Sequence, residues 1–250
     1  MFSRTKRGPA ATIHERFEHH VTLRPRAIAL ECDGVQLTYR EVNQDANRMA
    51  RRLASARVGT DGLVVISMER SCELVITLLA VMKAGGAFVL TPSALSTRQW
   101  DEFMKTTAAE VVVTDSICRP VPKQLRVVRY YAVSGNDANL NQATQGDRWA
   151  CVVAGKARSH ETVLQLLDDA SHQQQFQAGD GMFTATDLTG QAALDLFLPL
   201  ITGGRLVLAA QQDLREPQRL QAAIQAANCK FIRLPKTETL TLVRSAAASA

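Results

Sequence analysis

The stretch LVVISMERSCELVITLLAVMKAGGAFVL, residues Leu63–Leu90, decides the fold class. It opens with an apolar run of strand length, Leu63–Met68. After Ser71, a residue type favoured at helix N-caps, an apolar segment of helical length follows. Two glycines end that helix, and a second apolar strand follows over Ala87–Leu90. Two buried strands joined by a helix predict a parallel pair, because parallel neighbours need a crossover connection.

The same alternation extends through the rest of the chain. Helical spacing of apolar residues predicts helices over Glu41–Arg57, Cys72–Ala84, Thr97–Thr107, Glu161–Gln175, Ala192–Ile201 and Pro217–Ala227. Short apolar runs predict further strands over Val111–Thr114, Leu125–Val133, Trp149–Ala154, Met182–Thr186, Leu206–Ala209 and Lys230–Leu234. This order predicts an α/β fold with largely parallel sheets covered by helices.

A polar segment divides the pattern in two. Residues Ser134–Asp147 are rich in Asn, Gly and Gln and predict a loop between two lobes. We expect a flexible arm over residues 1–11, a first α/β lobe over residues 12–140, a second over residues 147–244 and a tail over residues 245–250.

Composition indicates an ordinary soluble globular protein, with 46% hydrophobic and 21% charged residues and a net charge of +5. Part of the basic excess lies in the cluster formed by Arg48, Arg51, Arg52 and Arg57, which is typical of a solvated helix face. Aromatic residues make up 5%, so no base-stacking pattern supports nucleic-acid binding. The longest apolar stretch, Leu74–Met82, is too short to span a membrane, and the N-terminus lacks a hydrophobic signal core. We therefore expect a cytoplasmic protein without nucleic-acid or membrane partners.

No metal site or disulfide is predicted. The cysteines are odd in number and far apart, without a CxxC pair, which indicates reduced thiols; they are Cys32, Cys72, Cys118, Cys151 and Cys229. His14, His19 and His20 are candidate metal ligands, but the adjacent His19 and His20 are interpreted as solvent-facing residues of a short helix, so no metal is expected. Asp168 and Asp169 are adjacent, so on a helix they point about 100° apart and do not form an acid pair.

Three segments resemble amino-acid adenylation domains. LTYREVNQDANRMARRL (Leu37–Leu53) resembles their first core motif, and VMKAGGAFVLTP (Val81–Pro92) is similar to the second, with Leu90 and Thr91 where the family usually has proline and a polar residue. LDLFLPLITGGRLVLA (Leu194–Ala209) resembles the helix, turn and strand after the fourth motif. The chain is identified as a truncated, degenerate member of the adenylate-forming, AMP-binding superfamily, closest to the nonribosomal peptide synthetase branch.

The resemblance covers residues 12–243 and implies the N-terminal subdomains of an adenylate-forming fold, the second of them incomplete. Members of the superfamily activate a carboxylic acid with ATP and magnesium and pass the acyl group to a thiol. The family's adenine, magnesium and ribose segments and its mobile lid are expected beyond this chain. The first two motifs build the sheet and do not touch substrate, so they indicate ancestry and not activity.

The family's phosphate loop is rich in Ser, Thr and Gly, ends in Pro-Lys-Gly, and joins an aliphatic strand to a helix that begins near a His. Here the strand WACVVA and the helix SHETVLQLL are joined by only a few residues around Gly155 and Lys156. These two do not match the GxxxxGK[ST] spacing, and Ala157 replaces the hydroxyl residue. We expect that the loop is deleted, that neither ATP nor magnesium binds, and that Lys156 and Arg158 attract anions only weakly.

The acid-binding side of the site also departs from the family pattern. Alignment on the Leu194 segment places Gly190 where the family usually has an Asp that pairs with the substrate's amino group. Relatives that activate keto or aryl acids also lack that Asp. Asp187 lies nearby as a substitute or as a cap or turn residue, and Asp187, Gly190 and Leu194 form the expected pocket remnant. No GxSxG or GxGxxG motif is present, and no catalytic residue is predicted.

Three functions remain open. The first is a catalytically inactive, pseudoenzyme module that acts as a structural or docking platform for carrier, condensation or ketosynthase domains, or self-associates, in a nonribosomal peptide or hybrid polyketide assembly line of antibiotic biosynthesis. The second is ATP-dependent adenylation of an amino or carboxylic acid, completed by another chain. The third is a remnant without a role. For the platform, we expect an exposed apolar surface over Ala192–Ile201 and Lys230–Val243, including Leu240 and Leu242.

Overall fold

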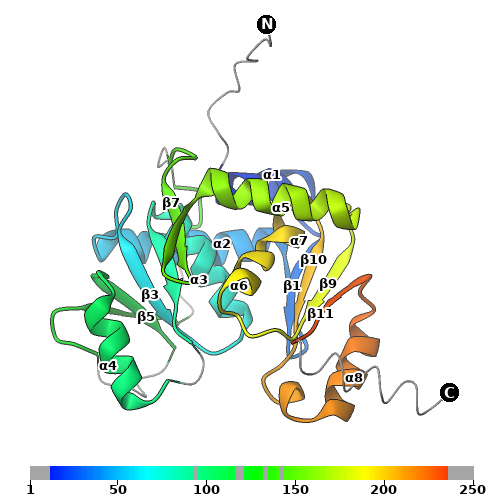
Figure 1. The fold of residues 1–250 in the computed structure, drawn as a ribbon. Helices are drawn as coiled ribbons and strands as arrows, with labels where there is room; N and C mark the ends of the chain where they lie inside the picture. Colours follow the sequence, from blue (N-terminus) through cyan, green and yellow to red (C-terminus); the bar gives the residue numbers. More distant parts are fainter. Residues whose placement is uncertain (1–11, 93–94, 116–120, 132–134, 141–143, 236–250) are drawn as a thin grey trace, which may run out of the picture.

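The computed structural model describes residues 12–92, 95–115, 121–131, 135–140 and 144–235. These residues form two sheets with helices between and outside them (Figure 1). The strand order is β6-β5-β3-β4-β7-β8 in the six-stranded sheet and β11-β9-β10-β1-β2 in the five-stranded sheet. The predicted α/β fold with largely parallel sheets is confirmed.

The six-stranded sheet contains the segment that decides the fold. Strands β3 (Leu63–Ser67) and β4 (Ala87–Leu90) are parallel neighbours, and β5 (Val111–Thr114) and β6 (Arg126–Arg129) extend the sheet in the same direction. Strand β7 (Trp149–Val153) is parallel to β4, and β8 (Lys156–Ser159) returns antiparallel to β7. All four residues of β5 are buried, as expected for a parallel strand that helices cover on both faces.

The five-stranded sheet combines both ends of the described chain. Strands β9 (Gly181–Thr184), β10 (Arg205–Leu208) and β11 (Phe231–Arg233) are parallel. Strand β1 (Ile28–Cys32) pairs in parallel with β10, and β2 (Val35–Thr38) lies antiparallel to β1 at the edge. Each sheet therefore takes strands from both predicted lobes, and the sheets are not divided at the polar segment Ser134–Asp147.

Helices form three layers around the two sheets. Figure 1 shows α4 (Thr97–Thr106) outside the six-stranded sheet and α8 (Pro217–Ala227) outside the five-stranded sheet. Trp100 of α4 shares a buried cluster with Val112 of the first sheet, and Leu220 of α8 shares another with Val207 of the second. The remaining helices share one buried cluster with the inner faces of both sheets: α1 (Ile13–Leu23), α2 (Tyr39–Ser55), α3 (Cys72–Lys83), α5 (His160–Gln174), α6 (Gln191–Asp195) and α7 (Phe197–Thr202).

Local sequence explains where these elements begin. Helices α1, α2 and α4 start with capping boxes, formed for example by Thr38 and Glu41, while Ser71 caps α3 as predicted. Between α3 and β4, a Cβ atom on Gly86 would lie 2.8 Å from Val58 Cγ1 and 2.9 Å from the Gly62 carbonyl oxygen. Only glycine fits this crossing without displacing backbone.

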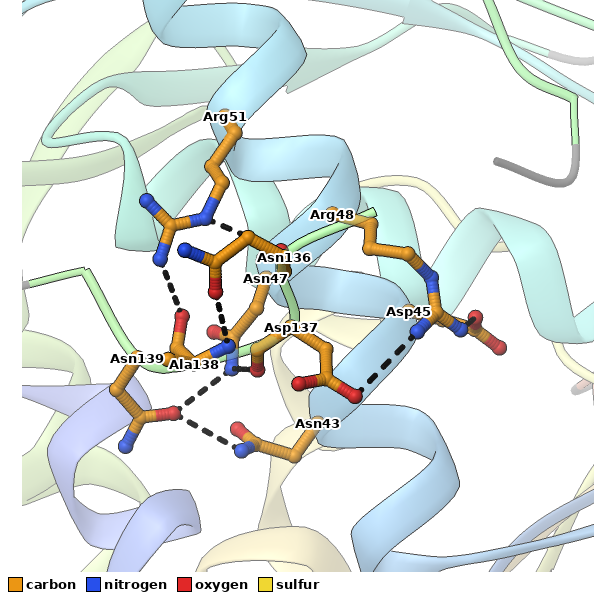
Figure 2. A network of polar contacts seen from close by, with 9 residues as sticks. All are labelled: Asn43, Asp45, Asn47, Arg48, Arg51, Asn136, Asp137, Ala138 and Asn139. Carbon is orange, nitrogen blue, oxygen red and sulfur yellow. Dashed lines mark hydrogen bonds and ion pairs between the residues drawn. The ribbon is translucent and has the colours of Figure 1, made fainter. Parts of the chain in front are cut away.

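The polar loop over residues 135–140 is held by helix α2 (Figure 2). Asn47 Nδ2 donates to the Asp137 carbonyl oxygen at 2.6 Å and to Asn139 Oδ1 at 2.8 Å, and Asn43 Nδ2 donates to the same Asn139 oxygen at 2.9 Å. Arg51 donates to two loop carbonyl oxygens at 3.1 and 2.7 Å. The basic cluster on α2 was predicted to be a solvated helix face. This is wrong in part, because Arg51 of the cluster donates hydrogen bonds to carbonyl oxygens of the polar loop.

Candidate functional site

A two-residue turn stands where the sequence predicts a deleted phosphate loop. Strands β7 and β8 pair up to Val153 and Lys156, and only Ala154 (φ 50°) and Gly155 (φ 72°) lie between them. Two successive left-handed residues make the tight hairpin that matches the twist of antiparallel strands. The connection is therefore a β-hairpin and not the expected strand-to-helix link, and β8 was missed by the sequence analysis.

The turn between β7 and β8 is short compared with a phosphate-binding loop. Binding a phosphate chain needs several backbone N–H groups converging from a glycine-rich loop or a helix N-terminus. Here the strands pair directly up to the turn, while the side chain of Lys156 is exposed. The hairpin therefore presents the exposed cation of Lys156 beside the two-residue turn.

Helix α5 follows β8 directly and begins with a buried histidine. Ser159 caps the helix, and the backbone N–H of Ile13 donates to His160 Nδ1 at 3.4 Å. The His14 ring meets the His160 ring edge-on, with 5.5 Å between the ring centres. Burial lowers the pKa of His160 to about 4 and also lowers the pKa of His14, so both rings are neutral at pH 7.

A cavity of about 790 Å³ lies at the carboxyl ends of strands from both sheets. Ligands of open α/β sheets bind at this edge, and the volume is within the range of small-molecule sites. Apolar residues such as Trp100 and Leu188 form part of its wall. Six charged residues also line it: Glu69, Arg70, Asp115, Arg129, Asp187 and Arg215. The mixture of signs leaves this cavity without a clear preference for cations or anions.

Arg70 connects the two sheets across the cavity. It follows β3 of the six-stranded sheet, and its guanidinium donates to the carbonyl oxygens of Thr184, at 3.2 Å, and Thr186, at the end of β9 in the other sheet. Burial lowers the pKa of Arg70, whereas the charge of Asp187 raises it. No sequence pattern singled out Arg70, because the contact depends on how the two sheets face each other.

The three residues of the predicted pocket remnant lie apart. Asp187 lines the large cavity. Gly190, with φ 61°, is the residue before α6, and Leu194 is buried in the central core. Neither belongs to the cavity wall, so the structure brings only Asp187 to it.

The structure does not expose the apolar docking surface that the sequence predicts at Ala192–Ile201. Residues 193–194 and 196–201 are buried against the central core, so the expectation of an exposed apolar face at Ala192–Ile201 is wrong. The reason is that α6 and α7 pack between the sheets. Ile232 on edge strand β11 is 45% exposed, and Leu240 and Leu242 lie outside the described residues.

Other residues that the sequence analysis singled out have structural roles. Asp168 accepts both hydrogen bonds of a bidentate pair from Arg16, at 2.9 and 2.8 Å, which ties α5 to α1. His14 is buried, and His19 is exposed as predicted. The interpretation of His20 as solvent-facing is wrong in part, because its half-buried ring is bonded to the Ile201 carbonyl oxygen at 2.9 Å. Among the described cysteines, Cys32, Cys72, Cys151 and Cys229 are free thiols, and burial raises the pKa of each.

Comparison with known proteins places this geometry in a family. The family model described as AMP-binding enzyme matches residues 17–156, more than half of the chain. The chain belongs to the AMP-binding enzyme family. Within the residues that the structure describes, this family member has no helix long and apolar enough to cross a membrane.

Curated relatives of this AMP-binding enzyme family member are nonribosomal peptide synthetases. It is 27% identical over 261 residues to the dimodular nonribosomal peptide synthase of Bacillus subtilis, which covers 94% of the chain and 11% of the relative. It is 50% identical over 78 residues to gramicidin S synthase 1 of Brevibacillus brevis, covering 31% of the chain and 7% of that protein. The chain thus spans a small part of these relatives, and the predicted resemblance to adenylation domains is confirmed.

Solved structures show the same fold. The nonribosomal peptide synthetase FmoA3 superposes with a TM-score of 0.80 at 23% identity, over 89% of this chain and 25% of that one. The N-terminal subdomain of NpsA from Klebsiella oxytoca superposes with a TM-score of 0.75 at 22% identity, over 90% of this chain and 60% of that one. At this identity the likeness establishes the adenylation-type fold alone.

Proposed function

We propose that this chain is an adenylation-type module that does not activate an acid with ATP and acts as a structural platform for neighbouring carrier domains in a peptide-synthetase assembly. The observation that carries the proposal is the hairpin turn at Ala154 and Gly155. In intact adenylation domains this connection holds the phosphates of ATP. A two-residue turn leaves no loop to hold them, and positioning and charge stabilisation supply most of the acceleration in phosphate chemistry.

Two further observations support the proposal. Gly190 has no side chain to pair with a substrate ammonium group, which is costly to bury without a counter-ion. The relatives are multidomain synthetases, and one solved structure with this fold, NpsA-ThdA of Klebsiella oxytoca, is an artificially fused adenylation-PCP di-domain. A carrier domain is therefore the partner that we propose first, ahead of a condensation or ketosynthase domain.

The direct test is a calorimetric titration of the protein with magnesium-ATP, together with amino-acid-dependent pyrophosphate exchange. An intact adenylation domain serves as the positive control for both assays. We expect no saturable binding and no exchange above the no-enzyme background. Saturable micromolar binding that is lost in Lys156→Ala would show that the shortened hairpin still holds phosphate and would refute the proposal.

A second experiment separates the platform from adenylation completed by another chain. Carrier and condensation domains encoded beside this chain are tested as partners by light scattering and pull-down. We expect a complex with the carrier domain without ATP. Pyrophosphate exchange that appears only when a separate adenylation C-terminal chain is added would instead support the split enzyme.

A further inference from the structure

A second pocket, which is basic, lies between strand β6 and the C-terminal turns of helix α2. Its volume is about 370 Å³. Arg48, Arg51, Arg52 and Ser55 line it from α2, and the opposite wall is formed by β6 residues and residues 135–136 of the polar loop. No acidic side chain belongs to the lining among the described residues, in contrast to the large cavity between the sheets.

Charge in this pocket is only partly balanced. Arg48 is paired with Asp45, and its Nη1 lies 3.7 Å from Asp137 Oδ2 (Figure 2). Arg51 donates to two neutral carbonyl groups of the loop, so its charge has no carboxylate partner within the described chain. These bonds use Nε and Nη2 and fix the guanidinium in place while Nη1 remains available.

Arg52 provides the second unbalanced charge. Its guanidinium carbon lies over the Tyr131 ring, 3.8 Å from the ring centre, and this cation–π contact helps to hold the group in place. Its Nη1 is buried and has no hydrogen-bond acceptor in the described structure. A buried donor without an acceptor is costly, and a guanidinium has no neutral form at accessible pH.

The position of Arg52 at the end of α2 does not account for this arrangement. A cation in the last turn is favoured by the helix dipole. The dipole, however, gives no acceptor to Nη1, and it does not explain why Arg51 is held beside it with a donor to spare. Arg51 keeps Nη1 as an unused donor, and the Arg52 side chain beside it is partly exposed to the pocket. Guanidinium groups bind the oxygens of a phosphate in bidentate fashion.

We propose that this pocket binds the phosphate group of a small phosphomonoester, with Arg51 Nη1 and the Arg52 guanidinium as donors. The volume exceeds that of a phosphate group alone, and Val127, 46% exposed, gives the wall an apolar portion. A small apolar substituent on the phosphate therefore fits the remaining space. This site is separate from the β7–β8 hairpin and does not depend on the proposed loss of ATP chemistry.

The test is a calorimetric titration of the full chain with phenyl phosphate, inorganic phosphate and phenol, at one ionic strength set with chloride. We expect saturable binding of phenyl phosphate, weaker binding of inorganic phosphate and none of phenol. Arg52→Met removes the charge but keeps the length of the side chain, and it should weaken phenyl phosphate binding about tenfold or more. Arg52→Lys keeps a positive charge but lacks the planar, bidentate donors of a guanidinium, so it should weaken phenyl phosphate binding by an intermediate amount.

The matched control is Arg57→Met, which removes one positive charge from an exposed residue outside the pocket lining. It should leave binding unchanged. Equal weakening in Arg57→Met and Arg52→Met would show general charge attraction and overturn the site, as would absence of saturable binding to the wild-type chain. A short phosphotyrosine peptide should bind no more tightly than phenyl phosphate; binding about tenfold tighter would assign the pocket to a protein partner and overturn the small-molecule proposal.

Discussion

Tyr39→Phe tests how the start of helix α2 is joined to the five-stranded sheet. The Tyr39 ring is fully buried and stacks on Phe17 with 5.6 Å between ring centres. Its hydroxyl donates to the Gly204 carbonyl oxygen at 2.8 Å and lies 3.2 and 3.3 Å from the carbonyl oxygens of Pro199 and Leu200. Phenylalanine keeps the ring but removes the only proton that this group offers to the three oxygens.

The cost follows from that geometry. A net hydrogen bond contributes about 1 kcal/mol, and a buried acceptor left without its donor costs about 1–3 kcal/mol. We therefore expect the free energy of unfolding to fall by about 2 kcal/mol. With a urea m-value of about 3 kcal/mol/M, the midpoint of unfolding should fall by roughly 0.7 M.

The assay is urea unfolding followed by circular dichroism, with Tyr131→Phe as the control. The Tyr131 ring is 59% exposed, and its contact with Arg52 uses the ring face, which phenylalanine retains. This control should change the free energy of unfolding by less than about 0.5 kcal/mol. Equal midpoints for Tyr39→Phe and the wild type, at equal m-values, would refute the role assigned to the buried hydroxyl.

Two further changes test the packing and the buried histidines. Gly86→Ala should lower the free energy of unfolding by about 2 kcal/mol, because the Gly62 carbonyl oxygen would lie 2.9 Å from the new Cβ. The control, Gly59→Ala, should cause no loss, because no atom lies within 4 Å of its new Cβ. Urea unfolding that gives the same stability for the two variants would contradict this account. Burial holds the folded-state pKa of His160 at about 4, below its unfolded value of about 6.5. Protons therefore bind preferentially to the unfolded chain, and the free energy of unfolding falls as the pH drops from 6.5 towards 4. At pH 5 the loss due to His160 should be about 2 kcal/mol. His160→Asn, which retains an acceptor for the Ile13 N–H, should reduce the slope of the free energy of unfolding between pH 6.5 and 5, and an unchanged slope would show that this histidine does not dominate.

The sequence predicted the elements of the fold better than their arrangement. Strands such as Leu63–Ser67 and Val111–Thr114 are buried apolar runs, and local periodicity is sufficient to find them. Strand β8, with the sequence KARS, was missed because it is mostly polar and lies at a sheet edge. The interleaving of the two sheets was also missed, because pairing such as that of β1 with β10 depends on residues far apart in the chain.

The candidate site was predicted in part. The shortened connection around Gly155 is visible in the sequence because the flanking strand and helix are easily recognised. Asp187 was singled out from its place near a strand end, and the structure places it in the cavity wall. No sequence pattern singled out Arg70, because its role comes from carbonyl groups of the other sheet. Arg52 was noted only as one member of a basic cluster, because its place in the pocket lining depends on the fold.

The pairing of β1 with β10 has a consequence for synthesis of the chain. Strand β1 leaves the ribosome about 175 residues before the segment that hydrogen-bonds to its parallel edge. At about 5–20 residues per second, that edge waits roughly 10–30 s with only the β2 hairpin beside it. Translation intermediates therefore expose an unpaired apolar strand edge, which is a template for association with other nascent chains. A chaperone or slow elongation around residues 181–208 would act at the step that closes this edge.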